Sequence, residues 1–592
     1  MYVSEPIAPP GSTRIAYFSM EIGLDPSMPT YAGGLGILAG DTLRAAADLE
    51  VPLVVVTLLH RKGYFHQHLD ATGNQQESPE GWAPEESLEP LSPQVSLTLD
   101  GQQVQVQAWR YLLQGISGYV VPVFFLDTFL PENSPEAQAL TDHLYGGDDR
   151  YRLRQEAVLG LGGLAMLRQL GYKNLQVYHL NEGYSALLAL ALLEEQVAGR
   201  SLQCITTADW EAVRQRCIFT THTPVPAGHD QFPMELARQV LGEEYAYTLE
   251  TNGCCPKGVL NLTYVALFFS HYINGVSMRH EEVSQGMYPN YSINAITNGV
   301  HAATWVSPAF ARLYDRHIPE WCRDNQYLRY AVSIPLEEVL QAHRQAKRDL
   351  LEEVVRRTGT SLDLGVLTIG FARRATAYKR ADLLFSDLEW LRRIAQEAGP
   401  LQVIYAGKAH PKDRSGKELI QRIFRAGAAL NDTIPVLYLE GYDLSLAKLL
   451  CAGVDLWLNT PQKPREASGT SGMKAALNGV PSLSVLDGWW VEGHEEGVTG
   501  WSIGEDWQED SDLATESASL YNKLESVIVP MFYSRATAYT KVMRSTIALN
   551  GSFFNAQRML TQYMINAYNS SGLPITHLPD AGIWSSLEDE GE

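Results

Sequence analysis

A run of small and hydroxyl side chains leads directly into a lysine at residues 465–474, Arg-Glu-Ala-Ser-Gly-Thr-Ser-Gly-Met-Lys. We expect a loop here, followed by a short helix over 473–478 with Lys474 in its first turn. The backbone N–H groups of such a loop bind anions, and the partial positive charge of a helix N-terminus adds to this. The pattern suits an aldehyde cofactor that carries a phosphate, because the lysine forms a Schiff base while the loop holds the phosphate.

Spacing alone leaves a second interpretation of this segment open. A Gly/Ser turn that caps a helix, with Lys474 in solvent, fits the loop equally well. A nucleoside triphosphate is disfavoured, because the segment lacks the spacing of a P-loop.

Cationic side chains gather at or just past the expected strand ends of the second half: Arg373, Arg374, Lys379, Arg380 and Lys408. Arg373 and Arg374 directly follow an apolar strand, which places them at the crevice of a sheet rather than on its outer wall. Guanidinium groups grip phosphate bidentately, and lysine adds a point charge. We therefore expect two phosphates close together, one on the cofactor and one free. A solvated basic helix start is the alternative.

Polar residues also stand at the ends of three expected strands in the first half: Glu182, His222 and Asn298. Ligands bind at the carboxyl ends of strands in open parallel sheets, so we expect these residues to meet in one substrate crevice. A lone histidine after a strand is also compatible with a structural role. The three strands are expected over 175–180, 218–224 and 292–301.

The elements that position these residues form two series of alternating strands and helices, which predicts an α/β fold with doubly wound parallel sheets. The glycine loop of the first series, Gly-Gly-x-Gly, does not match the dinucleotide fingerprint. The first series opens with a strand over 15–21, the glycine loop 31–36, a helix over 37–49 and a strand over 51–59. The second has five strands, over 366–371, 401–406, 436–439, 454–458 and 482–486.

The remaining segments connect or cover these sheets. We expect a surface insertion over 70–93, a hairpin over 95–109, a long helix over 150–170, a hinge region over 302–331 and a helix over 336–357. A helix over 555–568 follows, and the polar, acidic tail 569–592 is expected on the surface or disordered.

Composition excludes several classes of function. The chain has 592 residues, enough for two large domains, and its formal net charge of −22 argues against a general nucleic-acid or membrane-surface binder. The six cysteines have no metal-ligand spacing, so we expect no metal site and a reducing cytoplasm. No apolar run is long enough for a signal peptide or a membrane span.

The segment Glu466-Ala-Ser-Gly-Thr-x-x-Met-Lys474 resembles the pyridoxal-phosphate lysine segment of the α-glucan (glycogen/starch/maltodextrin) phosphorylases, in the form of the shorter bacterial and archaeal branch. The segment 373–380 and the glycine loop 31–36 resemble other parts of the same family. The resemblance implies a GT-B fold, in which two Rossmann-like domains face each other across a cleft. The domains would span 1–301 and 302–568, followed by the tail 569–592, and the C-terminal helix would cross back to the first domain.

The resemblance also implies roles for individual residues. Arg374 and Lys379 would hold inorganic phosphate, while Arg373 would touch the phosphate of pyridoxal 5'-phosphate on Lys474. The other implied contacts are Tyr442 near the cofactor, the N–H groups of Gly469, Thr470 and Ser471 on its phosphate, Tyr378 on the sugar, Glu466, Ser468 and Gly469 on the hydroxyls of the reacting glucose, His222 and Asn298 at its 6-hydroxyl, and Gly33 and Leu35 in the glycine loop beside the site.

The implied reaction is reversible, retaining phosphorolysis of α-1,4-glucan ends by inorganic phosphate, giving α-glucose 1-phosphate. A homodimer is one expected assembly. The chain departs from the family pattern at Ile37, Tyr184, Thr376 and Ala377, which affects acceptor specificity rather than the cofactor. The alternatives are a nucleotide-sugar-dependent glucan synthase of the same fold and an inactive glucan-binding regulatory homologue. A pyridoxal transaminase is disfavoured, because no carboxylate is evident as a partner for the pyridine nitrogen.

Overall fold

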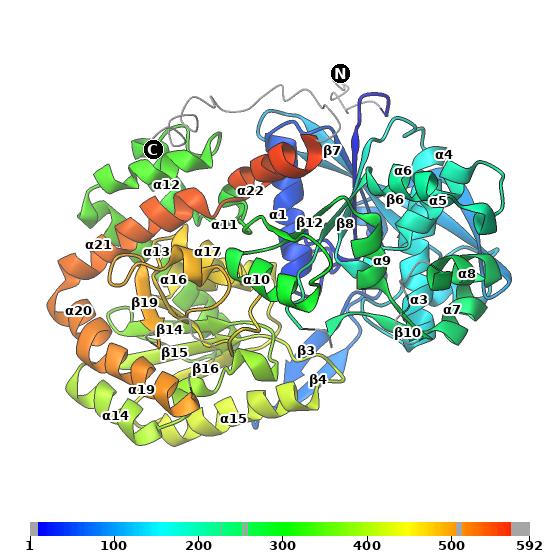
Figure 1. Cartoon of the computed structure of the whole chain (residues 1–592). Helices are drawn as coiled ribbons and strands as arrows, with labels where there is room; N and C mark the ends of the chain where they lie inside the picture. Colours follow the sequence, from blue (N-terminus) through cyan, green and yellow to red (C-terminus); the bar gives the residue numbers. More distant parts are fainter. Residues whose placement is uncertain (1–9, 226–227, 252–254, 256–257, 505–511, 570–592) are drawn as a thin grey trace.

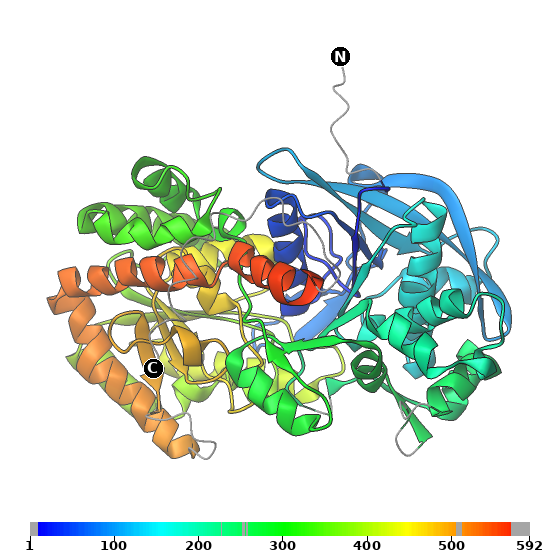
Figure 2. The same cartoon turned by 45° about the horizontal axis from the view of Figure 1, so that its top comes forward.

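The computed structural model describes residues 10–225, 228–251, 255, 258–504 and 512–569; the expectations for the first nine residues, for Cys254 and for the tail beyond 569 lie outside this range. The described chain is mixed α/β, with two large sheets flanked by helices (Figure 1). A second view shows the same two halves, with the C-terminal helices passing from one to the other (Figure 2). No helix in these ranges has both the length and the apolar character that crossing a membrane requires.

The first sheet has the strand order β13-β12-β9-β8-β1-β2-β7-β6-β5 among the described residues. Strands β13 to β7 pair in parallel, and β6 and β5 add an antiparallel edge. Side chains alternate between two cores, with Ile15 and Tyr17 on one face and Ala16 and Phe18 on the other, which explains the continuous apolar runs. The strands are β1 Ile15–Ser19, β2 Leu53–Leu58, β5 Glu89–Leu99, β6 Gln102–Gln114, β7 Val120–Asp127, β8 Val177–Asn181, β9 Cys217–Thr220, β12 Tyr272–Gly275 and β13 Asn294–Ala295.

The second sheet is parallel and has the order β16-β15-β14-β17-β18-β19. Counted along the chain this is 3-2-1-4-5-6, the order of a doubly wound sheet with a ligand crevice at its switch point. All five predicted strands are present. The sixth, β19, begins at a glycine and was not predicted. The strands are β14 Leu367–Ala372, β15 Leu401–Ala406, β16 Val436–Leu439, β17 Leu456–Asn459, β18 Ser482–Val485 and β19 Gly500–Ile503.

Helices cover both faces of the two sheets (Figure 1). The described helices are α1 Gly34–Asp48, α2 Pro135–Gln138, α3 Asp149–Ala157, α4 Gly163–Gln169, α5 Leu188–Val197, α6 Thr207–Arg214, α7 Met234–Leu241, α8 Glu243–Thr251, α9 Leu262–Phe269, α10 Met278–Met287, α11 Ala302–Trp305, α12 Pro308–His317, α13 Leu336–Thr358, α14 Leu388–Glu397, α15 Arg414–Leu430, α16 Leu444–Gly453, α17 Ser471–Ala476, α18 Trp490–Gly493, α19 Leu513–Lys523, α20 Val529–Ser534, α21 Ala536–Thr546 and α22 Ala556–Tyr563.

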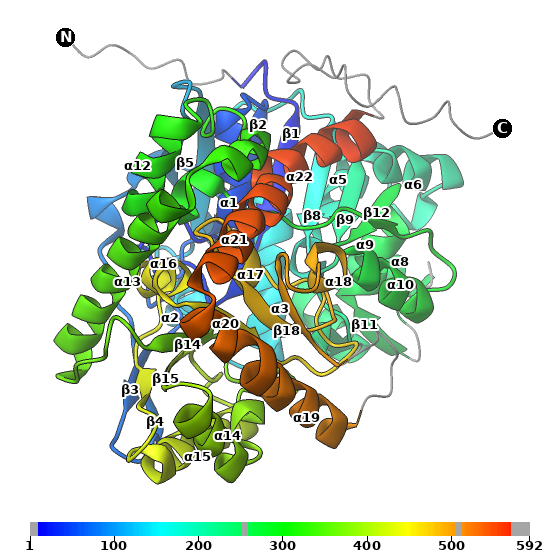
Figure 3. The same cartoon turned by 90° about the vertical axis from the view of Figure 1, so that its left-hand side faces the viewer.

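The C-terminal helix α22 returns to the first half and completes the core beside α1 (Figure 3), which confirms the predicted crossing. Met559, Leu560 and Tyr563 are buried in the same cluster as Leu38 and Leu43 of α1. Polar bonds fix the contact: Tyr563 pairs with Thr220 at 3.0 Å, and Tyr568 pairs with His179 at 2.8 Å. The last strand of the second sheet is therefore followed by helices that end in the core of the first.

The segment 70–93 is not simply a surface insertion, as the sequence predicted. Within it, β4 Gln75–Ser78 pairs with β3 His66–Leu69, which directly precedes the segment, and the hairpin they form contacts the backbone after β15 of the second sheet. Gln67 donates to the Gly407 carbonyl at 2.9 Å, and Gln75 donates to the Ala409 carbonyl at 2.8 Å. The polar composition of this region predicted exposure to solvent. Instead, the side-chain amides of Gln67 and Gln75 are buried and form hydrogen bonds to backbone carbonyls just after β15.

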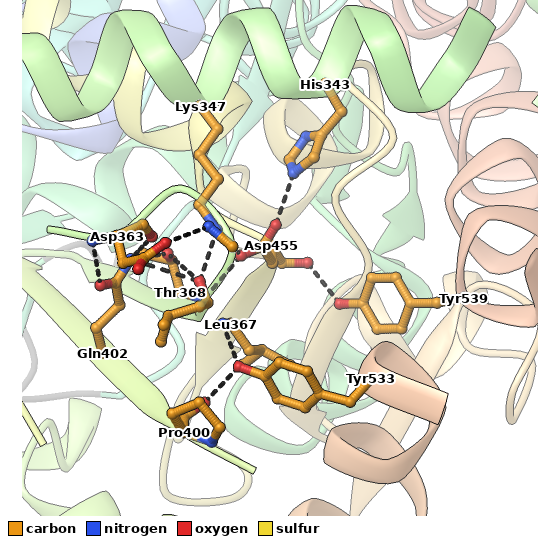
Figure 4. A network of polar contacts seen from close by, with 12 residues as sticks. His343, Lys347, Asp363, Leu367, Thr368, Pro400, Gln402, Asp455, Tyr533 and Tyr539 are labelled. Carbon is orange, nitrogen blue, oxygen red and sulfur yellow. Dashed lines mark hydrogen bonds and ion pairs between the residues drawn. The ribbon is translucent and has the colours of Figure 1, made fainter. Parts of the chain in front are cut away.

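A buried polar network at the amino ends of the central strands β14 and β17 joins them to α13 and α21 (Figure 4). Asp455 accepts hydrogen bonds from Lys347 at 2.6 Å and from the Thr368 N–H at 2.7 Å, and it pairs with His343 at 2.8 Å. The Tyr539 hydroxyl donates to the Asp455 carbonyl at 2.7 Å. Such a network fixes the helices against the sheet, because each buried charge depends on its partner.

The predicted strand over 292–301 is wrong for most of its length, since only Asn294–Ala295 forms strand pairs. Beyond it, the Asn298 N–H donates to the Val276 carbonyl at 3.0 Å and the Val300 N–H to the Phe554 carbonyl at 3.1 Å. The backbone here is satisfied by a loop and by the segment before α22, which the local pattern could not reveal.

Candidate active site

Lys474 is buried on α17, between the two halves of the molecule. Its Nζ lies 4.0 Å from the centroid of the Trp305 ring, and Nζ has no hydrogen-bond partner within the described chain. Trp305 Nε1 in turn donates to Asp41 of α1 at 2.8 Å. Burial lowers the pKa of Lys474, and the Asp41 charge opposes this shift. The interpretation with Lys474 in solvent is therefore wrong.

The loop before α17 needs glycine at position 469. Gly469 has φ +74°, and a Cβ there would lie 3.2 Å from Glu466 Oε1 and 3.3 Å from Arg373 Nη2. The Ser468 hydroxyl is buried without a hydrogen-bond partner in the described structure. Thr470 is the N-cap of α17, and the Ser471 hydroxyl accepts from Trp457 at 3.1 Å. This loop thus presents an unsatisfied polar atom and free first-turn N–H groups beside an arginine.

The Glu466 carboxylate binds two of the five predicted cationic side chains. Its Oε2 accepts hydrogen bonds from Arg373 at 2.8 Å and from Lys379. Burial alone would raise the pKa of Glu466, but the charges of Arg373 and Lys379 lower it to about 2. The Glu466 N–H donates to Asp487 at 2.9 Å, and burial with the nearby Glu466 charge raises the pKa of Asp487 to about 7.

The five predicted cations do not form one cluster. Arg374 is exposed, and among the described residues it makes no ion pair; its electrostatic neighbours include Tyr145 and Tyr184 of the first half. Arg380 donates to the Thr460 carbonyl at 2.9 Å and pairs with Glu516. Lys408 donates to the Phe65 carbonyl at 2.9 Å. Arg374, Arg380 and Lys408 therefore lie outside the Glu466 cluster, and Lys408 also comes from a different strand end.

The strand ends of the first half bring Glu182 and His222 together. Glu182 accepts from the His222 N–H at 2.7 Å and from Thr223 Oγ1 at 3.1 Å, while His222 Nε2 pairs with Asn181 at 2.7 Å. Burial raises the pKa of Glu182 to about 7 against the lowering effect of these bonds. Asn298 is also buried, but no hydrogen bond joins it to this pair, and its Oδ1 lacks a partner among the described residues.

The positions of the remaining predicted residues are as follows. Tyr31 of the glycine loop packs against the second core and accepts from the Leu444 N–H at 2.9 Å. Tyr442 is close to Tyr31 and Arg373, and burial raises its pKa. The Lys379 ammonium lies 4.5 Å from the centroid of the Tyr378 ring. Gly33 is the N-cap of α1, and Leu35 in its first turn is partly exposed.

Sequence reasoning missed Glu21 as a site residue. Its Oε2 accepts from the Ala32 N–H at 2.6 Å and its Oε1 from Tyr145 at 2.9 Å, so it holds the glycine loop in place. Burial raises the pKa of Glu21, and Arg374 is among the charges that lower it. The available signal was its position two residues after the end of β1, close to the strand-end placement that identified Glu182.

Comparison with known proteins shows the family to which the chain belongs. The chain is 36% identical to the maltodextrin phosphorylase of Thermococcus litoralis, over 94% of this chain and 70% of that protein. It is 35% identical to the glycogen phosphorylase of Mycobacterium tuberculosis, over 94% and 71%, and 34% identical to that of Aquifex aeolicus, over 94% and 86%. The chain belongs to the carbohydrate phosphorylase family. The family's own sequence profile, "Carbohydrate phosphorylase", matches residues 255–501.

The family profile of the carbohydrate phosphorylases covers the second sheet and the loop around Lys474, and the full-length relatives extend the likeness through the first sheet. Membership favours the phosphorylase interpretation over the nucleotide-sugar synthase, because the relatives named above are phosphorylases.

Proposed function

We propose that this protein is an α-glucan phosphorylase that carries out reversible, retaining phosphorolysis of α-1,4-glucan ends. Inorganic phosphate is the second substrate, and α-glucose 1-phosphate is the product. The observation that carries the proposal is the burial of Lys474 between the two halves, in a family whose named members include maltodextrin and glycogen phosphorylases. The proposal makes the protein a hexosyltransferase of carbohydrate metabolism.

The proposal includes the finer architecture. Residues 1–301 and 302–568 form two Rossmann-like domains in the GT-B arrangement, facing each other across a cleft. The order of the second sheet and the polar strand ends of both sheets support it. A cytoplasmic location and a homodimer stay predictions from the sequence and the resemblance.

Pyridoxal 5'-phosphate is the proposed cofactor, and the residues present fit it. Lys474 has an amine without a hydrogen-bond partner in the described chain for covalent attachment, and the Gly469 cradle with the first-turn N–H groups suits a phosphate. Arg373 and Tyr442 lie beside this loop. When bound, the cofactor supplies a phosphate that acts as an acidic or electrostatic partner to the substrate phosphate.

The chain's own residues position the two substrates. Arg374 and Lys379 hold inorganic phosphate, which protonates the glycosidic oxygen and then attacks the anomeric carbon of the oxocarbenium-like sugar. Glu466 stays ionised at neutral pH because its pKa is near 2, so it can accept hydrogen bonds from sugar hydroxyls. The remaining hydroxyl contacts are assigned to Ser468, Gly469, Tyr378, His222, Asn298 and Glu182, with Gly33 and Leu35 closing the site from the glycine loop.

The inactive regulatory homologue is the second candidate, because Tyr184, Thr376, Ala377 and Ile37 depart from the family pattern. Glucan binding by a cofactor-loaded protein without turnover would support it. A nucleotide-sugar synthase would instead use ADP-glucose and show no pyridoxal absorbance.

The test is to record the absorbance of the purified protein before and after borohydride, map the labelled lysine, and compare Lys474→Ala. We expect label on Lys474 alone, and loss of both cofactor and glucose 1-phosphate release in the variant. Lys541→Ala, a lysine on α21, is the control and should keep both. Full activity of Lys474→Ala without cofactor would refute the proposal.

A further inference from the structure

Asn298 lies on a segment that forms few hydrogen bonds to the first sheet. The strand β13 ends at Ala295, and the Asn298 N–H donates to Val276 at the end of β12. Its side-chain Oδ1 is buried and has no partner among the described residues, so it is available as a hydrogen-bond acceptor.

This segment is next to the loop around Lys474. Ser277, which follows Val276, donates its hydroxyl to the Ala467 carbonyl at 2.6 Å. Thr297 donates to Glu492 of α18 at 2.7 Å. Asn298 is thus linked to the loop that is proposed to hold the reacting sugar through two hydrogen bonds, one from its own N–H to Val276 and one from the neighbouring Ser277 to Ala467.

One side chain from the far end of the chain holds the carbonyls of this segment. Arg558 of α22 donates to the Thr297 carbonyl at 2.6 Å and to the Asn298 carbonyl at 2.9 Å, and its Nε donates to the Phe553 carbonyl at 2.8 Å. Its guanidinium is buried, and burial lowers the pKa of Arg558 to about 10, so it stays charged at neutral pH. A planar fork with fixed donors orients two successive carbonyls in a way that a single ammonium does not.

Backbone contacts strengthen the same clamp. A Cβ at Gly299 would lie 2.1 Å from the Asn555 carbonyl oxygen, so these two segments of the chain are close enough to require glycine at position 299. Val300 donates to Phe554 at 3.1 Å and accepts from the Ala556 N–H at 2.9 Å. The C-terminal helix α22 lies beside α1 at the junction of the two halves (Figures 1 and 3).

We propose that Arg558 is a positioning residue for the reaction: it fixes the 297–298 backbone so that the Asn298 amide recognises the 6-hydroxyl of the reacting glucose. The inference rests on the proposed function. It adds that selectivity for a hexosyl unit with a free 6-hydroxyl depends on the C-terminal helix, which does not itself touch the sugar.

The experiment compares glucose 1-phosphate with 6-deoxyglucose 1-phosphate in the synthetic direction, using a maltooligosaccharide acceptor. The readout is the ratio of the two kcat/KM values, which does not depend on the fraction of folded enzyme. The variants are Asn298→Ala, Arg558→Lys and the double variant, each checked for bound cofactor by absorbance. Met559→Ala is the matched control, because Met559 is the buried neighbour on α22 that packs in the core beside α1.

We expect Asn298→Ala and Arg558→Lys each to lower the preference for the 6-hydroxyl donor about fivefold, the size of one lost hydrogen bond. The double variant should lose no more than Asn298→Ala alone, because both changes remove one contact. Met559→Ala should keep the wild-type ratio.

Three outcomes would overturn the inference, and the first two are a wild-type ratio in Arg558→Lys and additive losses in the double variant. Unchanged selectivity in Asn298→Ala would also overturn it, because the contact that Arg558 positions would not exist. A wild-type protein that turns over neither donor would refute the proposed function itself, and this result is seen without any variant.

Discussion

Glu466 is the residue on which the charges of the site converge. It binds Arg373 and Lys379 through one carboxylate oxygen, while Arg374 is left facing the tyrosines of the first half. Lys379 is therefore shared between a fixed carboxylate and the proposed substrate phosphate. If Lys379 binds the substrate phosphate as proposed, the Glu466 carboxylate would hold the ammonium in place beforehand and compete with phosphate for it.

Glu466→Gln is expected to lower kcat/KM for α-glucan roughly 10- to 100-fold, because charged hydrogen bonds contribute about 1.5–3 kcal/mol. Glucose 1-phosphate release would measure the effect, and cofactor absorbance should remain. Glu495→Gln, at an exposed position, is the control. An unchanged kcat/KM in Glu466→Gln would contradict the assigned sugar contact.

Several residue roles could not be predicted, because the partner is remote in sequence. Lys474 was identified from its own segment, since small residues and a helix start are local features. The contact between Trp305 and Asp41 spans 264 positions, and the bond from Arg558 to Thr297 spans 261. The strand ends predicted Glu182 correctly as a neighbour of His222, but no local pattern shows that Arg380 turns away to Glu516.

At the scale of elements, apolar runs predicted the strands of both sheets well, because burial on both faces leaves a continuous pattern. The pattern failed where an element is held by distant backbone, as over 292–301, or where buried amides replace apolar side chains, as in Gln67 and Gln75 of the β3–β4 hairpin. The Asp455 network in Figure 4 is a third case, because it joins α13 and α21 through charges.

Asp455→Asn is expected to destabilise the protein by about 3–5 kcal/mol, because it leaves the buried Lys347 without a counter-charge. Although burial opposes it, Lys347 and His343 lower the pKa of Asp455 below its unfolded value of about 4. A lowered pKa gives stability that is present above the unfolded pKa and lost as the pH falls through the folded one.

The gap in unfolding free energy between wild type and Asp455→Asn should therefore be constant above about pH 5 and narrow below about pH 4. Urea denaturation at a series of pH values measures it. Glu352→Gln, exposed on α13, should show no such gap. A gap that widens on acidification would contradict the sign of the shift.

At the scale of the whole molecule, each half receives a segment of chain that belongs by sequence to the other half. The helix α22 is the last of the helices that follow β19 of the second sheet, yet its residues Met559, Leu560 and Tyr563 belong to the core beside α1. The hairpin β3–β4 makes the reverse crossing from the first half to the end of β15. These two crossings, α22 and the β3–β4 hairpin, fix the two halves relative to each other on either side of the proposed cleft.

Leu560→Ala is expected to cost about 2–5 kcal/mol and to loosen the first half, although the change lies near the C-terminal end of the described chain. Hydrogen exchange should rise in β1, β2 and α1 more than in β14 and β15. Ile565→Ala, 48% exposed, should leave all of them protected. Equal loss of protection in both sheets would show that α22 does not serve the first core specifically.

The return of α22 has a consequence for synthesis on the ribosome. The last strand of the first sheet is translated about 260 residues before α22 emerges. At 5–20 residues per second this is a delay of roughly 10 to 50 s. During that interval the part of α1 that packs against α22 lacks its partner, so this core cannot be completed until α22 has been synthesised.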